Sequence, residues 1–127
     1  ADGIHCHPLS ANIVYNTRPK KVVLVTDAMA AMGLPPGRFE LGPMAVDIKT
    51  EGRYEGLHAV ISGTSTLAGS VVSMDQCVQN FKKFTGCAVW EVLEAATRHP
   101  AKVLNKLGEH GCLEHGALAD MVLLNDA

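Results

Sequence analysis

Asp27 occupies the position in this chain where catalytic chemistry is easiest to place. It follows the aliphatic run Val22–Val25, in which three of four residues are β-branched. Such a run predicts a strand over Lys21–Ala28 that is covered on both faces, as in a parallel sheet. Substrates and catalytic side chains gather at the carboxyl ends of parallel strands. From the residues alone, Asp27 is either a general base or metal ligand, or a cap on the following turn.

His5 and His7 form an H-x-H pair near the start of the chain. Alternate residues of a strand point to one side, so such a pair is suited to holding a metal ion. One hypothesis is therefore a small α/β metal-binding module that uses His5, His7 and Asp27, and another is a non-catalytic assembly piece. An ordinary polar loop residue is the competing interpretation of His7. The remaining histidines are expected to be either solvated or structurally hydrogen-bonded; they are His58, His99, His110 and His115.

A glycine- and hydroxyl-rich loop, residues 62–70, offers a second type of site. Gly69 allows the backbone to approach a ligand closely, and Ser70 is predicted to cap the next helix at its anion-favouring end. Leu67 and Ala68 precede this glycine. Without further information, the favoured interpretation is a capped loop that contacts no ligand.

The elements that would position these residues follow from hydrophobic spacing and turn residues. A short helix from Ser10 to about Asn16 is expected, with Ser10 as its cap and with Ile13 and Val14 facing inward. The other predicted elements are antiparallel strands at Phe39–Leu41, Ala45–Lys49 and His58–Ile61, helices from Val71 to Gly86, Val89 to His99 and Ala101 to Asn105, and a turn followed by a strand within Gly111–Leu124. A single buried strand cannot form a parallel sheet, so its neighbours are expected outside this chain or in another copy of it.

Composition narrows the possible classes of protein. The 127 residues are 47% apolar and 19% charged, which predicts a globular fold. A net charge of −2, scattered Lys and Arg residues and 5% aromatic residues argue against a nucleic-acid partner. No apolar run approaches the roughly 20 residues of a membrane span, and Ala1–Gly3 has no signal-peptide pattern. Four cysteines without a CxxC pair favour free thiols and a cytoplasmic setting.

Five sequence blocks resemble one enzyme family. They are Asp2–His5, Leu24–Ala28, Thr66–Ser70, Ala96–Ala101 and Gly116–Val122, in that order. Together they are similar to the carboxyl-terminal third of the N-acetylglucosamine-6-phosphate deacetylase family, within the amidohydrolase superfamily. The spacing between His5 and Asp27 also matches this family. The first three blocks are the more specific, because the last two occur in many amidohydrolases.

The resemblance implies an α/β fold, namely part of a metal-dependent (β/α)8 TIM-type barrel with part of a small β-sandwich domain. Asp2–His5 would close barrel strand seven, and Lys21–Asp27 would form strand eight. Residues 38–61 would be an excursion at the barrel mouth. On this basis, residues 1–110 belong to the barrel, and residues 111–127 return to the β-sandwich. The chain is therefore expected to be an incomplete part of the fold.

The resemblance also implies roles for individual residues. Asp27 would move a proton between water and the departing amine, and His5 with Leu67, Ala68 and Gly69 would contact a sugar-phosphate substrate. The divalent metal ion of the family, zinc or similar, would have its ligands outside this chain. The full-length protein would be a homodimer whose phosphate-binding arginine is also missing here. The 127-residue chain alone is predicted to be inactive and to hold no catalytic metal tightly.

Overall fold

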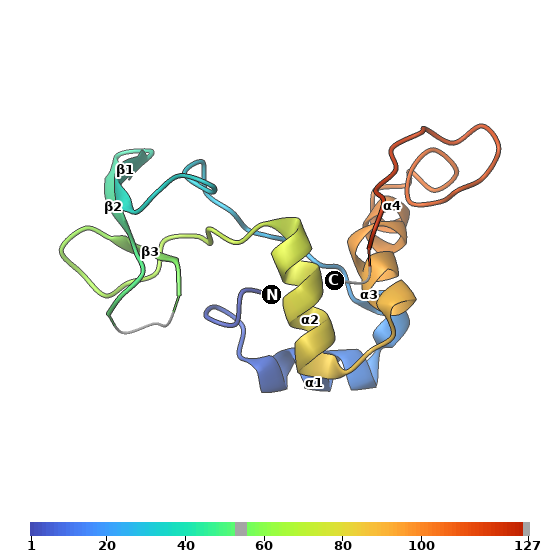
Figure 1. The fold of residues 1–127 in the computed structure, drawn as a ribbon, viewed down its shortest axis with the longest axis horizontal. Coiled ribbons are helices and arrows are strands. Elements are labelled where there is room, and N and C mark those ends of the chain that lie inside the picture. The colour runs from blue at the N-terminus through green and yellow to red at the C-terminus, as the bar shows by residue number, and fades with distance from the viewer. Residues whose placement is uncertain (53–55, 126–127) are drawn as a thin grey trace.

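The computed structural model describes residues 1–52 and 56–125, which fold into a helical lobe and a sheet lobe (Figure 1). Residues 53–55 of the predicted excursion, and residues 126–127 of the predicted return segment, lie outside this described part. The helices are α1 (Pro8–Thr17), α2 (Met74–Thr85), α3 (Val89–Ala96) and α4 (Arg98–Val103), with a 3₁₀ turn, η1, at Pro19–Lys21. The strands are β1 (Gly37–Leu41), β2 (Met44–Lys49) and β3 (His58–Ile61). None of the described helices is long and apolar enough to cross a membrane.

The helical lobe forms because α2 has one apolar face. Cys77 and Phe81 on this face are buried, and Phe81 packs edge-on against Tyr15 of α1 with ring centroids 6.0 Å apart. The helix ends at Gly86, whose φ of 70° permits the left-handed cap conformation. The core of the lobe contains Ala11, Val22, Leu24, Phe81, Cys87, Val92 and Ala95. The predicted helix from Val71 is therefore confirmed, although it begins at Met74.

The sheet lobe is a three-stranded antiparallel sheet in the order β1-β2-β3, as the sequence predicts. Phe39 pairs with Val46, and Ile48 pairs with Ala59. Inward-facing residues of β2 alternate along the strand, so Val46 and Ile48 are buried while Asp47 is only half-buried. The core of this lobe contains Met29, Ala31, Val46, Ile48, Ala59, Ala68 and Val71.

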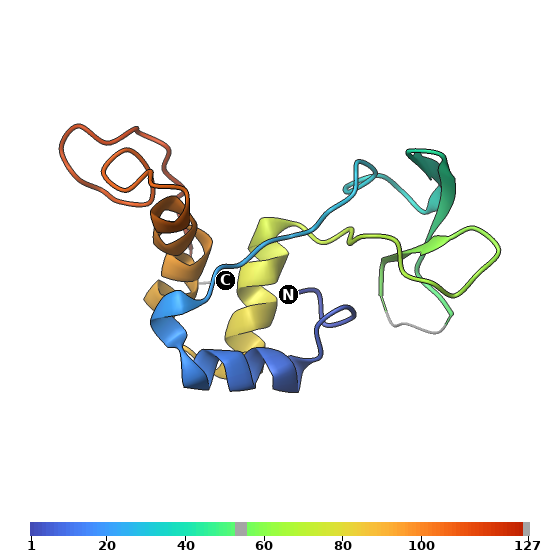
Figure 2. The ribbon, with the colours of Figure 1, turned by 180° about the vertical axis from the view of Figure 1, so that it is seen from behind.

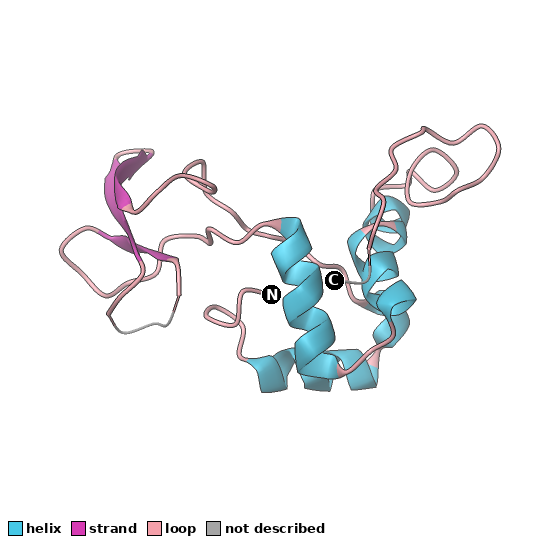
Figure 3. Ribbon diagram, in the orientation of Figure 1, coloured by secondary structure: helices cyan, strands magenta, loops and turns pink. Residues whose placement is uncertain are grey.

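Two backbone segments connect the lobes and run side by side (Figure 2). One leads from Val22 to Ala31, and the other leads from β3 through Gly69 to α2. They touch at a parallel bridge between Ala28 and Ser70. Helices thus occupy one side of the molecule and strands the other, with the connecting segments between them (Figure 3).

The predicted buried strand at Lys21–Ala28 is wrong for this chain. Lys21 belongs to η1, the residues from Val22 are not in a sheet, and only Ala28 forms an isolated bridge. Val22 and Leu24 are buried, whereas Val25 is 62% exposed. A strand is defined by hydrogen bonds to a neighbouring strand, and apart from the single bridge at Ala28 the described residues pair no strand with this run. The aliphatic run therefore predicts the burial of Val22 and Leu24 correctly, but the predicted burial of the opposite face is wrong.

Three further expectations are corrected. No strand occurs in the described part of Gly111–Leu124, where Leu123 is 98% exposed, because nothing pairs with it there. Helix α1 begins at Pro8, and its cap is His7 rather than Ser10. Ile13 and Val14 face outward, since the helical core meets α1 through Ala11 and Tyr15.

The remaining helix predictions are close to the observed bounds. The helix from Val89 ends at Ala96 rather than His99, and α4 begins at Arg98 rather than Ala101. Pro100 lies in the first turn of α4, where its missing N–H costs nothing. The helix pattern was therefore correct, while the break between α3 and α4 lies earlier than predicted.

Candidate active site

Asp27 adopts a backbone conformation that non-glycine residues rarely use. Its φ is 51°, and Asn105 is the other non-glycine residue with positive φ in the described part of the chain. The left-handed region costs an L-residue on the order of 1 kcal/mol, although Asp tolerates it better than most. The Asp27 side chain is exposed. An exposed carboxylate carried on a strained backbone, between the two lobes, is a candidate for a functional residue.

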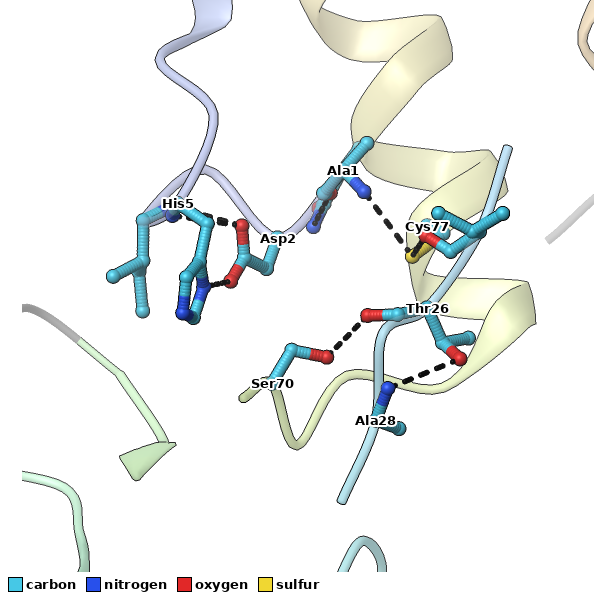
Figure 4. A network of polar contacts seen from close by, with 10 residues as sticks. Ala1, Asp2, His5, Thr26, Ala28, Ser70 and Cys77 are labelled. Carbon is cyan, nitrogen blue, oxygen red and sulfur yellow. Dashed lines mark hydrogen bonds and ion pairs between the residues drawn. The ribbon is translucent and has the colours of Figure 1, made fainter. Parts of the chain in front are cut away.

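Ser70 holds the backbone around Asp27 in this conformation. Its amide donates to the Asp27 carbonyl at 2.9 Å, and its carbonyl accepts from the Met29 amide at 2.9 Å. Its hydroxyl donates to the carbonyl of Thr26 (Figure 4). Ser70 is therefore not the helix cap that the sequence predicts. Helix α2 begins too far along the chain for that role, and Ser73 occupies the cap position.

The predicted substrate-contacting loop lies directly beside Asp27. Leu67 bridges to Val60, and the Ala68 amide donates to the Ala59 carbonyl at 3.0 Å, so this segment extends the sheet edge. Gly69 then leaves the sheet with a φ of 70°. A Cβ at Gly69 would lie 3.5 Å from the Asp27 carbonyl oxygen. The structure thus brings Gly69 and Asp27 together, with the half-buried Leu67 and the buried Ala68 next to them.

His5 lies on the loop before α1, with a carboxylate as its partner. Its Nδ1 is 2.5 Å from Asp2 Oδ2 (Figure 4). Asp2 Oδ1 also accepts from the amides of Ile4 and His5, both at 3.1 Å. Burial raises the pKa of Asp2, but these hydrogen bonds, above all the one from the His5 ring, lower it further than burial raises it. The pKa of Asp2 therefore lies below its ordinary value. No sequence pattern gives Asp2 a role of its own, although its position three residues before His5 is the spacing that allows this turn.

Helix α2 supports both segments that carry the predicted site residues. Cys77, which is fully buried, accepts from the Ala1 nitrogen at 3.4 Å, and its thiol lies 3.9 Å from the Val25 carbonyl (Figure 4). The Asn80 side chain donates to the Ala1 carbonyl at 3.1 Å. Ala1, which precedes the His5 loop, and Val25, which precedes Asp27, therefore both contact α2.

His58 and His99 have structural hydrogen bonds, as expected, and His7 has one as well. His7 Nδ1 accepts from the Leu9 amide at 3.2 Å and so caps α1. His58 Nδ1 lies 2.8 Å from the Gly56 carbonyl, and His99 Nδ1 lies 2.6 Å from the Val22 carbonyl. All four cysteines are free thiols.

The metal-module hypothesis, which joined His5, His7 and Asp27, is not supported by the arrangement of these residues. Within residues 1–52 and 56–125, no group of three or more His, Cys, Asp and Glu side chains is placed to hold a metal ion. His7 Nδ1 caps α1 and His5 Nδ1 contacts Asp2, and neither histidine belongs to a group of this kind. The described residues therefore do not fit a metal centre of their own.

Comparison with known proteins identifies the class to which this fold and site belong. No family model matches the chain. A curated relative from Danio rerio, named N-acetylglucosamine-6-phosphate deacetylase, is 49% identical over 126 residues, which are 99% of this chain and 30% of the relative. A relative from Escherichia coli (strain K12), named putative N-acetylgalactosamine-6-phosphate deacetylase, is 36% identical, and the match covers 98% of this chain and 71% of the relative.

A solved structure agrees with these relatives. It is a Mycobacterium smegmatis N-acetyl-D-glucosamine-6-phosphate deacetylase mutant in complex with N-acetyl-D-glucosamine-6-phosphate. It matches with a TM-score of 0.81 and 29% identity, over 93% of this chain and 30% of that one. All of these proteins are named as deacetylases of amino-sugar phosphates. The chain belongs to the N-acetylglucosamine-6-phosphate deacetylase family. It spans about 30% of the length of the first curated relatives, close to the expected third.

Proposed function

We propose that this chain is part of an enzyme that hydrolyses N-acetylglucosamine 6-phosphate to glucosamine 6-phosphate and acetate. The names of the curated relatives support this activity over nearly the whole chain. The substrate class is supported by the matching structure that contains N-acetyl-D-glucosamine-6-phosphate. The proposal includes action in the cytoplasm, which free cysteine thiols favour.

In this proposal Asp27 is the general base and then the general acid. A water oxygen attacks the acetamide carbonyl carbon while the Asp27 carboxylate takes one water proton. The C–N bond then breaks, and Asp27 returns the proton to the nitrogen, so that acetate and the free amine leave. The single observation that carries this role is the strained, exposed Asp27, which Ser70 holds at the junction of the two lobes.

Substrate contacts are proposed for two segments beside Asp27. His5 would present its ring to the sugar, and Leu67, Ala68 and Gly69 would present backbone and side-chain surface. Support comes from Gly69, whose backbone lies against the Asp27 carbonyl, and from the common attachment of the His5 and Asp27 segments to α2.

The divalent metal ion implied by the family resemblance is assigned to ligands elsewhere in the full-length protein. It would supply positive charge to polarise the substrate carbonyl. Because the described residues include no group suited to a metal ion, both proton transfers are assigned to Asp27. We further propose that these residues complete a (β/α)8 barrel, divided at about residue 110 from a return segment to a β-sandwich, in a homodimeric enzyme. The isolated 127-residue chain would then be inactive.

Substitution of Asp27 in the full-length protein tests this function. Acetate release from N-acetylglucosamine 6-phosphate is measured for the wild type and for Asp27→Asn. The variant is expected to lose at least about 100-fold in kcat, because an amide cannot accept the proton. Asp120→Asn, which changes an exposed carboxylate in the carboxyl-terminal segment, is the control and keeps wild-type kcat. Wild-type turnover by Asp27→Asn would refute the role of Asp27, and an inactive wild type would refute the function.

A further inference from the structure

We infer that Asp2 is a positioning residue that fixes the ring orientation and the tautomer of His5, so that His5 presents Nε2 to the sugar. This inference rests on the proposed function through the assignment of His5 to substrate contact. It adds a residue that touches no substrate and acts through its neighbour.

The geometry of the Asp2 carboxylate carries the inference. One oxygen, Oδ1, accepts from the amides of Ile4 and His5 and so closes the turn that carries the histidine. The other oxygen, Oδ2, lies 2.5 Å from His5 Nδ1. A single carboxylate thus fixes both the backbone and the ring of His5. The Asp2 side chain is only 11% exposed, whereas the His5 side chain is 35% exposed. The carboxylate is therefore largely covered, and the His5 ring is partly accessible to a ligand.

The chemistry of an ionised carboxylate then decides which nitrogen faces outward. A carboxylate accepts hydrogen bonds and donates none, so the proton between the two groups belongs to Nδ1. The depressed pKa of Asp2 keeps this carboxyl ionised at neutral pH, the main opposing influence being its burial. In the neutral ring, Nε2 is therefore an acceptor, suited to a hydroxyl or N–H group of the sugar. In the protonated ring Nδ1 still serves Asp2, and Nε2 again faces the ligand.

The distinguishing variant is Asp2→Asn in the full-length protein. Its side-chain oxygen can still accept from the amides of Ile4 and His5, so the turn is retained. Its NH₂ group, however, donates, and it repels a protonated Nδ1. The proton is expected to move to Nε2, which reverses the hydrogen-bonding character presented to the sugar. We expect KM to rise about tenfold, with a smaller change in kcat, because a substrate hydrogen bond is lost.

The tautomer is measured directly by ¹⁵N NMR of histidine-labelled full-length protein, at a pH where the imidazole rings are neutral. His5→Gln assigns the His5 signals. The wild type should show a protonated Nδ1 and an unprotonated Nε2, and Asp2→Asn should show the reverse. Asp120→Asn is the matched control, since Asp120 lies 3.6 Å from His110 in another carboxylate–histidine pair. It should change neither KM nor the His5 signals.

The outcomes separate this inference from the proposed function. A wild-type His5 protonated at Nε2 overturns the inference, even where Asp2→Asn does not fold. An unchanged tautomer and an unchanged KM in a folded Asp2→Asn protein overturn it as well. A wild-type protein without deacetylase activity refutes the proposed function, whereas the NMR result on Asp2 and His5 is obtained independently of turnover.

Discussion

The amide of Ser70 donates to the carbonyl of Asp27 at 2.9 Å, although the two residues are far apart in the sequence. The Ser70 hydroxyl also binds the preceding carbonyl, that of Thr26. Two successive peptide groups at the candidate catalytic residue are thus held by one serine. The loop after β3 therefore fixes the backbone on which the Asp27 carboxylate is carried.

Replacing Gly69 by alanine should reduce activity by disturbing this contact. The φ of 70° strains an L-residue by on the order of 1 kcal/mol, and the new Cβ would lie 3.5 Å from both the Asp27 carbonyl oxygen and the Met29 Cβ. These Cβ distances are ordinary van der Waals contacts, so the disturbance is expected through the backbone. Relaxing the strained φ of residue 69 would move the next peptide N–H, that of Ser70, which donates to the Asp27 carbonyl. We expect kcat/KM of the full-length enzyme to fall at least about tenfold, because small misplacements of catalytic groups are costly.

Gly63→Ala is the matched control for Gly69→Ala. Gly63 has a φ of 77°, but a Cβ there meets nothing within 4 Å. Its backbone strain is similar, so a similar loss of stability is expected without the loss of activity. Equal kcat/KM values for the two variants would contradict the role given to the Gly69 contact with Asp27.

Gly111→Ala should be the most destabilising of the glycine substitutions considered. A Cβ at Gly111 would lie 2.8 Å from both the Arg98 Cα and the Thr97 carbonyl oxygen, and these backbone atoms cannot move without displacing α4. The free energy of unfolding of the full-length protein, measured by urea denaturation, should fall by about 2 kcal/mol or more. Gly116→Ala, where φ is 91° and no atom lies within 4 Å, should cost about 1 kcal/mol. Equal denaturation midpoints for the two variants would contradict this prediction.

The sheet lobe should lose stability in acid through Asp47. The Ser62 hydroxyl donates to Asp47 Oδ1 at 2.7 Å, and Lys49 Nζ lies 3.6 Å from Oδ2. The Ser62 hydrogen bond, with weaker help from Lys49 and Arg38, lowers the pKa of Asp47 below its ordinary value. A depressed folded-state pKa gives stability that is fully present above the unfolded pKa of about 3.9. This stability is lost as the pH falls from there through the folded pKa.

Asp47→Asn should therefore flatten the acid part of the stability profile. Thermal unfolding of the full-length protein is followed from pH 6 down to pH 3, together with Glu40→Gln as a change of the same charge on β1. The wild type and Glu40→Gln should decline more steeply than Asp47→Asn below about pH 4. Parallel profiles for Asp47→Asn and the wild type would show that Asp47 does not cause the loss of stability in acid.

The purified 127-residue chain should not deacetylate N-acetylglucosamine 6-phosphate. The described residues bring Asp27, Gly69 and the His5 loop to one region, but they provide no group able to hold a metal ion. Acetate release is compared with that of the full-length protein under the same conditions. Turnover at enzyme-like rates by the isolated chain would contradict this prediction.

Local sequence patterns predicted the elements that local contacts stabilise. The spacing of Val78, Phe81 and Phe84 predicted α2, and Gly86 correctly ended it. The three antiparallel strands were also predicted, because each pairs with its neighbour in the chain. By contrast, the run before Asp27 was predicted as a strand from its residue types. Whether this run forms a strand depends on a neighbouring strand, and the residue types within the run cannot show whether there is one.

The finer chemistry of the site depended on hydrogen bonds between distant segments. Ser70 has the residue type and position of a helix cap, yet its hydroxyl donates to the backbone carbonyl of Thr26. His7 looked like a loop histidine, and its capping of α1 follows from where Pro8 starts the helix. The pairing of Asp2 with His5 cannot be predicted from sequence, because an acidic residue three positions before a histidine is common and only the turn geometry makes it a partner.

The two cores meet along the backbone on either side of Asp27. Leu24 belongs to the helical core, Met29 belongs to the sheet core, and Asp27 lies between them. Each core is a candidate cooperative unfolding unit with its own rate of amide hydrogen exchange. Opening of either unit frees one end of the short segment that carries the carboxylate. The lifetime of the correctly placed Asp27 is therefore limited by whichever lobe opens more often.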